Sequence, residues 1–251
     1  MTATSSHADS YRVSHSSTGY GTQYSRVYQD GYYYKQWITI EKPLLTRILE
    51  SYKRQGATRV MDFACGTGRI LSVLERHFTN PTGVDVSESM LCFAKSTCIK
   101  SKILQQDITK EPIDCKFDLI TAFRFFLNAE ESLKIEALEA IRRNLTSDGI
   151  LIANIHQNSS SPLGMAHKVR NLITRSQRSN DLSYKEFEVV LNSCGFKVIE
   201  LHHYSFLPRP GWFASNILGS IILPFEQLCT FLRLPRFLCQ SYIVVAKRSC
   251  V

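Results

Sequence analysis

From residue 58 onward, short apolar segments alternate with longer amphipathic ones. Five apolar segments have the length of strands and are bounded by turn residues; they span residues 59–64, 82–86, 102–107, 117–123 and 149–156. Between them, apolar side chains keep helical spacing over residues 69–78 and 130–145. Strands that alternate with helices need crossover connections, so the pattern predicts an α/β fold with a parallel, doubly wound sheet and helices on both faces.

The C-terminal third continues this pattern and adds an apolar insert. Ser183 and Glu186 have the spacing of a capping box, Gly195 is placed to end the helix that follows, and strands are expected over residues 196–204 and 240–248. The insert between these strands covers about residues 206–238. Its uncharged stretch, 210–225, is shorter than the roughly 20 residues of a membrane span, and Pro224 interrupts it, so no transmembrane helix is predicted.

The N-terminal region divides into a polar tail and an aromatic segment. Residues 1–19 are rich in Ser and Thr and predict a flexible tail. Apolar side chains have helical spacing between residues 37 and 52, although Pro43 limits where that helix begins. Residues 20–57 are therefore expected to form a helical segment, which either packs on the domain or covers a pocket as a lid; one side of it would carry the tyrosines that recur every fourth residue, Tyr20, Tyr24, Tyr28 and Tyr32.

Composition excludes several classes of protein. The chain has 251 residues, 44% of them hydrophobic, as in an ordinary globular domain. Its eight cysteines include no C-x-x-C pair, which argues against a zinc or redox centre. The first residues have no apolar run of a secretory signal, so a cytoplasmic location is expected. The net charge of +8 favours anionic partners without selecting among nucleic acid, membrane and phosphorylated substrate.

A glycine-rich turn leaves the first predicted strand. Backbone at such a turn approaches a ligand closely and points N–H groups at it. The dinucleotide fingerprint G-x-G-x-x-G is incomplete in either register. The turn instead resembles the first motif of class I S-adenosylmethionine-dependent methyltransferases, D-x-G-x-G-x-G, here read as Asp62, Ala64, Gly66 and Gly68 with alanine in place of the first glycine.

Further motifs of this family follow in order at the ends of the predicted strands. The resemblance implies a seven-stranded, mostly parallel Rossmann-like sheet over residues 58–251, with helices on both faces and a C-terminal antiparallel strand. It also implies that Asp85 binds the ribose hydroxyls, although this residue can instead cap the helix beginning near Ser87. The implied cofactor is S-adenosylmethionine, and the residues implied to bind it are Asp62, Ala64, Cys65, Gly66, Gly68, Asp85, Val86, Gln106, Asp107, Ile108, Phe123 and Tyr34.

The acceptor side has fewer signals, because methyl transfer from a sulfonium needs positioning more than a catalytic side chain. His156 follows the fifth strand and is either a general base or a structural histidine. Arg124 is either an anion-binding residue or a surface cation, and Asn128 either orients the acceptor or, the preferred interpretation, caps the helix of residues 129–144. Tyr33 and Tyr34 resemble the N-terminal lid segment of family members that act on small molecules, which makes Tyr33 a second catalytic candidate beside His156.

These residues predict a methyltransferase that acts on oxygen or nitrogen of a small molecule, such as a sugar or secondary metabolite. A lipid or polyprenyl acceptor at a membrane surface is the alternative, with residues 211–238 as the membrane contact if they are not a buried cap. RNA methylation has only the charge in its favour, and a non-catalytic cofactor-binding protein stays open. Either a monomer or a homodimer fits the sequence.

Overall fold

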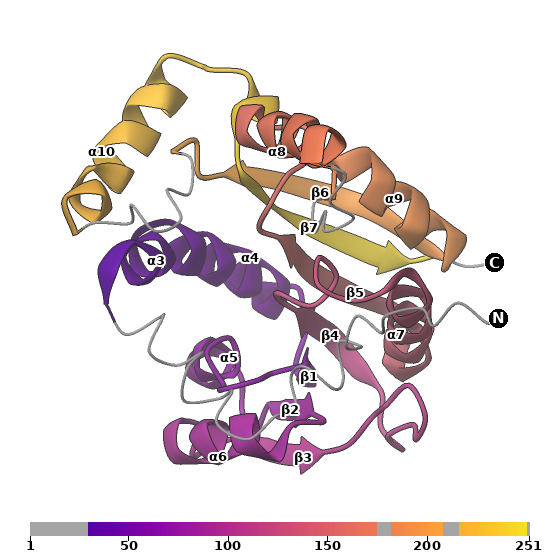
Figure 1. Ribbon diagram of the computed structural model, residues 1–251. Helices are drawn as coiled ribbons and strands as arrows, with labels where there is room; N and C mark the ends of the chain where they lie inside the picture. The colour runs from indigo at the N-terminus through magenta and orange to yellow at the C-terminus, as the bar shows by residue number, and fades with distance from the viewer. Residues whose placement is uncertain (1–29, 175–181, 208–215, 250–251) are drawn as a thin grey trace, which may run out of the picture.

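The computed structural model describes residues 30–174, 182–207 and 216–249 (Figure 1). Its centre is a seven-stranded sheet in the order β3-β2-β1-β4-β5-β7-β6. β7 is antiparallel to both of its neighbours, and the remaining pairs are parallel. The predicted Rossmann-like fold is confirmed; its strands are β1 (Val60–Phe63), β2 (Thr82–Asp85), β3 (Lys102–Gln105), β4 (Phe117–Ala122), β5 (Leu145–Ile155), β6 (Phe196–Tyr204) and β7 (Ser241–Arg248).

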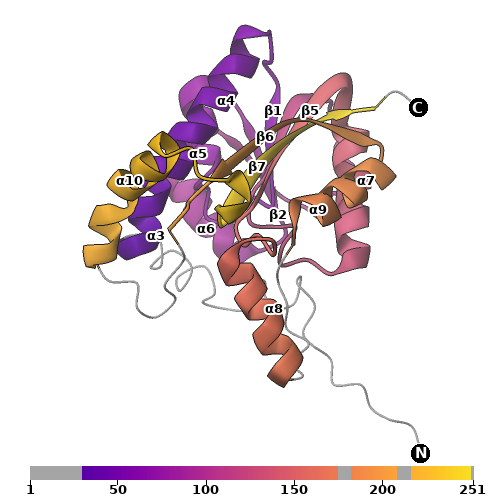
Figure 2. The ribbon, with the colours of Figure 1, turned by 90° about the horizontal axis from the view of Figure 1, so that it is seen from above.

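Helices cover both faces of this sheet (Figure 2), and those that pack on it bury apolar side chains in its core. On one face lie α7 (Glu131–Asn144) and α9 (Tyr184–Ser193), and on the other lie α4 (Lys42–Arg54), α5 (Leu71–His77) and α6 (Glu88–Thr97). The strands in the middle are buried on both sides, as β1 shows along its whole length. The predicted capping box at Ser183 and Glu186 is present at the start of α9.

The N-terminal helix is longer than the position of Pro43 suggested. It begins as α3 (Gly31–Gln36), widens into a π-helical turn (Trp37–Glu41) and continues as α4, with Pro43 in the first turn of α4. Proline lacks an N–H group and crowds the carbonyl four residues earlier, and the wider turn directly before it relieves this conflict. The tail of residues 1–19 and Tyr20, Tyr24 and Tyr28 lie outside the described residues.

β5 differs from the expected turn and strand. Its bounds already include residues 145–148, which lie between the expected helix and the expected fifth strand. The register explains this, because Phe117 pairs with Leu145 while Leu119 pairs with Ile150. Between these two pairs β5 advances by five residues and β4 by two, so β5 contains a bulge-like irregularity. A side chain at Gly149 would come within 3.0 Å of the Thr146 backbone nitrogen, which accounts for the glycine there.

The insert between β6 and β7 contains α10 (Asn216–Phe231) and a short 3₁₀ turn (Arg236–Leu238). α10 continues through Pro224, so this residue does not interrupt the helix as the sequence suggested. α10 packs against α3 at the margin of the molecule, whereas α8 (Pro162–Thr174) projects after β5 (Figures 1 and 2). None of the helices described here combines the length and the apolar character that crossing a bilayer requires.

Candidate functional site

A cavity opens at the carboxyl ends of β1, β2 and β4, the edge where open α/β sheets bind ligands. Twelve of the sixteen site residues predicted from the sequence line it. Four do not, namely Tyr33, Tyr34, Gly68 and His156. The twelve are Asp62, Ala64, Cys65, Gly66, Asp85, Val86, Gln106, Asp107, Ile108, Phe123, Arg124 and Asn128.

The turn after β1 has three residues with left-handed backbone. Their φ angles are 53° at Ala64, 54° at Gly66 and 84° at Gly68. A Cβ atom at Gly68 would lie 2.7 Å from the Cys98 sulfur, so this glycine lets the turn pack closely against α6. Gly68 thus shapes the turn from behind, which explains why it does not line the cavity.

Asp85, at the end of β2, holds that turn in place. Its Oδ2 accepts a hydrogen bond of 2.8 Å from the Gly66 N–H, and its Oδ1 accepts one of 2.8 Å from the Ser87 N–H. Ser87 is itself the N-cap residue of α6. A carboxylate has about four acceptor sites, so these two bonds orient the group without exhausting its capacity. The side chain therefore combines a structural role at α6 with a position on the cavity wall.

Asp62, in β1, is 1% exposed. Burial raises the pKa of its carboxyl to about 7, although the hydrogen bond from Thr121 and the charge of Arg69 act in the opposite direction. The Thr121 hydroxyl donates to Oδ1 over 2.7 Å, whereas Oδ2 is buried with no hydrogen-bond partner among the described residues. A buried acceptor of this kind, facing a cavity, fits a donor supplied by a ligand.

The β3 side of the cavity carries Gln106, Asp107 and Ile108, three of the residues implied to bind the cofactor. Asp107 Oδ1 accepts hydrogen bonds from the backbone and hydroxyl of Thr109, at 3.1 and 2.6 Å. The Gln106 amide donates to the Glu111 carbonyl over 2.8 Å. Ile108 is 1% exposed and belongs to the core cluster while also lining the cavity. These contacts fix the loop after β3 as one wall of the site.

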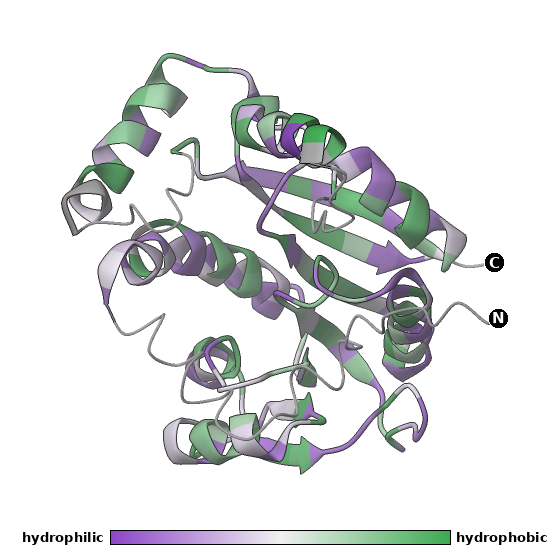
Figure 3. Ribbon diagram, viewed as in Figure 1, coloured by the Kyte–Doolittle hydropathy of each residue, from purple (hydrophilic) through white to green (hydrophobic). Residues whose placement is uncertain are grey.

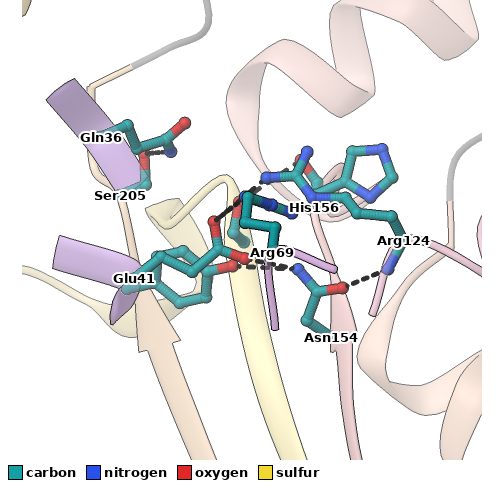
Figure 4. A network of polar contacts seen from close by, with 9 residues as sticks. Gln36, Glu41, Arg69, Arg124, Asn154, His156 and Ser205 are labelled. Carbon is teal, nitrogen blue, oxygen red and sulfur yellow. Dashed lines mark hydrogen bonds and ion pairs between the residues drawn. The ribbon is translucent and has the colours of Figure 1, made fainter. Parts of the chain in front are cut away.

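A buried ionic network, which the sequence analysis missed, borders the opposite wall (Figure 4). Glu41 is 1% exposed; its Oε2 lies 3.1 Å from Arg124 Nη2 and 4.0 Å from Arg69 Nη1. The Asn154 amide donates to Glu41 Oε1 over 2.9 Å, and its oxygen accepts from the Arg124 N–H at 2.7 Å. Arg69 also stacks on Trp37, with its guanidinium carbon 4.5 Å from the ring centroid. Both arginines line the cavity and are therefore not plain surface cations.

Two features of the sequence could have indicated this network. Asn154 is a polar residue inside the apolar fifth strand, and Glu41 follows Trp37 by four residues on the helix face that packs inward. A buried polar side chain in such positions needs partners.

The remaining predicted residues have different surroundings. α7 begins at Glu131 with Glu130 as its N-cap, so the preferred interpretation of Asn128 as the cap is wrong; its amide donates to the Arg124 carbonyl over 2.8 Å instead. This bond stabilises a turn in which Arg124 has a left-handed φ of 62°. Tyr33 packs partly buried against the core around α4, and Tyr34 is exposed at 36%. The His156 carbonyl accepts a hydrogen bond from Ser241.

Fold and cavity together define the class of this protein. The strand order, the turn of Ala64, Gly66 and Gly68, and an acid at the end of β2 are those of a class I S-adenosylmethionine-dependent methyltransferase. The cavity suits the cofactor, because Asp62 Oδ2, which has no hydrogen-bond partner in the described part of the chain, can accept from an ammonium group, and Ile108 provides an apolar wall. S-adenosylmethionine is the cofactor of this enzyme class.

Comparisons with known proteins support the same enzyme class. The model of the methyltransferase domain family matches residues 60–149. The chain is 28% identical over 179 residues to a protein of Geobacillus sp. (strain WCH70) named as a methyltransferase, covering 60% of this chain and 72% of that one. It is 28% identical over 133 residues to malonyl-[acyl-carrier protein] O-methyltransferase of Bacillus cytotoxicus, covering 50% of this chain and 46% of that one.

A solved structure shares the fold over almost the whole length. It is magnesium protoporphyrin IX methyltransferase from Synechocystis PCC 6803 with bound S-adenosylhomocysteine. The TM-score is 0.65 at 16% identity, with 95% of this chain and 97% of that one covered. The chain is thus an enzyme, a class I S-adenosylmethionine-dependent methyltransferase.

Proposed function

We propose that this methyltransferase acts on an oxygen or nitrogen atom of a small-molecule acceptor, such as a sugar or a secondary metabolite. One observation carries the proposal: Asp85 and Gly66 at one end, and Arg124 and Asn128 at the other, line a single continuous cavity. A cofactor and a small acceptor can share such a cavity, with their reacting atoms held together and water excluded.

In the cofactor half of the site, each residue has a specific proposed role. Asp85 accepts from the ribose hydroxyls, since its carboxylate is already oriented by two backbone N–H groups. Asp62 Oδ2 accepts from the ammonium group, because it is the buried acceptor without a protein partner among the described residues. Asp107 and Ile108 contact the adenine as acceptor and apolar wall. The bound cofactor supplies a methyl group that is already activated by its sulfonium.

The acceptor half is built from Phe123, Arg124 and Asn128, beyond β4. Arg124 offers a fixed cation to a polar or anionic group of the acceptor, because Glu41 and Asn154 hold it from behind. His156 follows β5 at the same edge of the sheet and is our candidate for the proton acceptor; Tyr33 is our candidate for covering the site from α3. Asn128 holds the Arg124 turn through its amide.

The proteins similar to this chain are named for very different acceptors, malonyl-[acyl-carrier protein] and magnesium protoporphyrin IX. The fold therefore leaves the choice of acceptor to residues outside the shared cofactor half. A lipid or polyprenyl acceptor is the second candidate, because α10 exposes apolar side chains next to the N-terminal helix.

The test combines binding with turnover. Calorimetry should show uptake of S-adenosylmethionine, and transfer of a labelled methyl group should then be measured with separate panels of sugars, phenols, lipids and tRNA. Transfer to the soluble small molecules supports the proposal, and Arg124→Ala should then raise the KM for the acceptor while cofactor affinity stays unchanged. Transfer confined to lipids or to tRNA would contradict it.

A further inference from the structure

We propose that the outer face of α10 docks the enzyme on an anionic lipid bilayer. The docking face is defined by five of the exposed apolar side chains on α10 and the residue that follows it, which are Ile221, Phe225, Leu228, Phe231 and Leu232. This inference concerns where the enzyme works and goes beyond the proposed function, since it holds for a soluble acceptor as well as for a lipid.

The inner face of α10 is already satisfied by the protein. Gly219, Ile222 and Cys229 are buried, and the spacing of three and seven residues places them on one side of the helix. At Gly219 an added Cβ would lie 3.1 Å from Lys35 Cγ in α3, so the two helices are in close contact. The orientation of α10 is therefore fixed, and so is the face that it turns outward (Figures 1 and 2).

The outward face is apolar where a surface helix is normally polar. Ile221, Phe225, Leu228 and Leu232 follow one another at intervals of four, three and four residues, which is the spacing of a single stripe. Their exposed fractions are 43, 36, 53 and 57%, and Phe231 beside them reaches 83%. Figure 3 shows the predominantly hydrophobic character of α10. A contiguous exposed stripe of this kind marks an interaction surface.

The charges around this stripe select the partner. Within the described part of the insert, residues 216–238, the charged side chains are Glu226, Arg233 and Arg236. Glu226 is turned inward and half-buried, because it accepts from the backbone N–H groups of Ser205 and Phe206 at 2.9 and 2.8 Å. Both arginines are exposed. Within residues 216–238 the exposed charges beside the apolar stripe are therefore both cations, and this combination complements the acyl boundary and headgroups of an anionic bilayer.

The topology relates the docking face to the cavity. β5 and β6 are both antiparallel to β7, so they run parallel to each other and end at the same edge of the sheet. The insert that carries α10 leaves from the end of β6, and the cavity lies at the ends of β1, β2 and β4 along that edge. Docking through α10 would thus bring the cavity edge toward the bilayer and shorten the path of an amphiphilic acceptor.

Vesicle sedimentation of the full chain tests this docking. We expect the protein to pellet with vesicles of phosphatidylcholine mixed with phosphatidylglycerol, much less with phosphatidylcholine alone, and less again as salt rises. Leu228→Glu combined with Phe231→Glu should weaken the partition at least roughly tenfold. The matched control is Ile99→Glu, because Ile99 is also 83% exposed but follows α6; it should bind like the wild type.

Two further measurements make the result decisive. S-adenosylmethionine affinity and thermal unfolding should be unchanged in the α10 variant, so a loss of vesicle binding cannot come from a failed cofactor site or fold. Excess glycerol phosphate should not release the protein, which separates a bilayer from a free phosphate ligand. The proposal is overturned if the wild type stays in the supernatant, if the α10 variant pellets normally, or if ultracentrifugation shows a dimer that the variant disrupts while no vesicles bind.

Discussion

Gly66 donates its backbone N–H to the Asp85 carboxylate over 2.8 Å, and this bond joins the turn after β1 to the end of β2. The same carboxylate receives the Ser87 N–H. The turn and the acid that are proposed to contact the cofactor thus hold each other before any cofactor binds. Such preorganisation lowers the ordering cost of binding.

Asp85→Asn should weaken S-adenosylmethionine binding. The substitution keeps the shape but removes the charge, and hydrogen bonds to charged groups contribute about 1.5–3 kcal/mol each. We expect affinity to fall roughly ten- to hundredfold by calorimetry. Asp118→Asn is the matched control, because Asp118 accepts from the Thr58 and Arg59 N–H groups before β1, outside the cavity lining. Equal losses of affinity in both variants would show that Asp85 acts only through general stability.

The convergence of the residues in the proposed cofactor half was predictable from the sequence because of a topological rule. In a parallel sheet, residues at the ends of successive strands converge on one edge, so Asp62, Asp85 and Asp107 come together whatever their separation along the chain. Local motifs that mark strand ends are then sufficient. The capping box of α9 was equally readable, because both of its partners lie within one turn.

The acceptor half was less predictable because its contacts are long-range. Glu41 meets Arg124 and Asn154 across 83 and 113 positions, and no local pattern encodes that meeting. Glu41 also ends a π-helical turn, which shifts the phase of the side chains that follow it. Asn128 was misassigned because α7 begins two residues later than the polar pattern suggested.

Asp62 should make the stability of the cofactor-free enzyme depend on pH. Burial raises its pKa from 3.8 to about 7, so the folded protein retains a proton that the unfolded chain has released. Its contribution to stability is therefore complete below pH 3.8 and is lost as pH rises toward 7 and beyond. Asp62→Asn cannot ionise, so it avoids the cost of a buried charged carboxylate. It should melt higher than the wild type at about pH 8, with a rise of roughly 2–4 °C for each kcal/mol of stability.

Cofactor binding should change in the opposite direction. An ammonium group prefers the ionised carboxylate, so wild-type affinity should rise as pH passes the Asp62 pKa of about 7, while Asp62→Asn should bind weakly at every pH. Asp118→Asn is the comparison, since burial pulls the Asp118 pKa upward but hydrogen bonds from Arg59 and Thr58 outweigh it and lower the pKa. A lower melting temperature of Asp62→Asn at about pH 8 would contradict the predicted ionisation of Asp62.

Ala64 has a left-handed backbone without being glycine, and its replacement should stabilise the protein. The φ of 53° costs an L-residue about 1–2 kcal/mol, and glycine avoids this cost. Glycine also makes the unfolded chain more flexible, which cancels part of the gain in stability. We expect Ala64→Gly to raise the free energy of unfolding by about 0.5–1 kcal/mol in urea titrations.

Two glycines of the same turn provide the comparison for Ala64. The Cβ added by Gly66→Ala would lie 3.5 Å from Met90 Cε, which is an ordinary contact. This variant should therefore lose about 1 kcal/mol of stability from backbone strain alone. Gly68→Ala would also press on Cys98 at 2.7 Å and should lose about 2–4 kcal/mol. The predicted order of stability is therefore Ala64→Gly, wild type, Gly66→Ala, Gly68→Ala. A different order would mean that the strain of the turn is relieved elsewhere.

Glu41→Gln should be strongly destabilising, because it leaves the buried guanidinium groups of Arg69 and Arg124 without their carboxylate. Removing one partner of a buried ion pair typically costs about 3–5 kcal/mol. Glu131→Gln is the control, since Glu131 is 73% exposed in its pair with Lys134 and should change stability by less than about 1 kcal/mol. Combining Glu41→Gln with Arg124→Gln should cost less than the sum of the single changes in urea unfolding. Additive losses would show that the two side chains contribute independently, and that Glu41 does not hold Arg124 in the cavity wall.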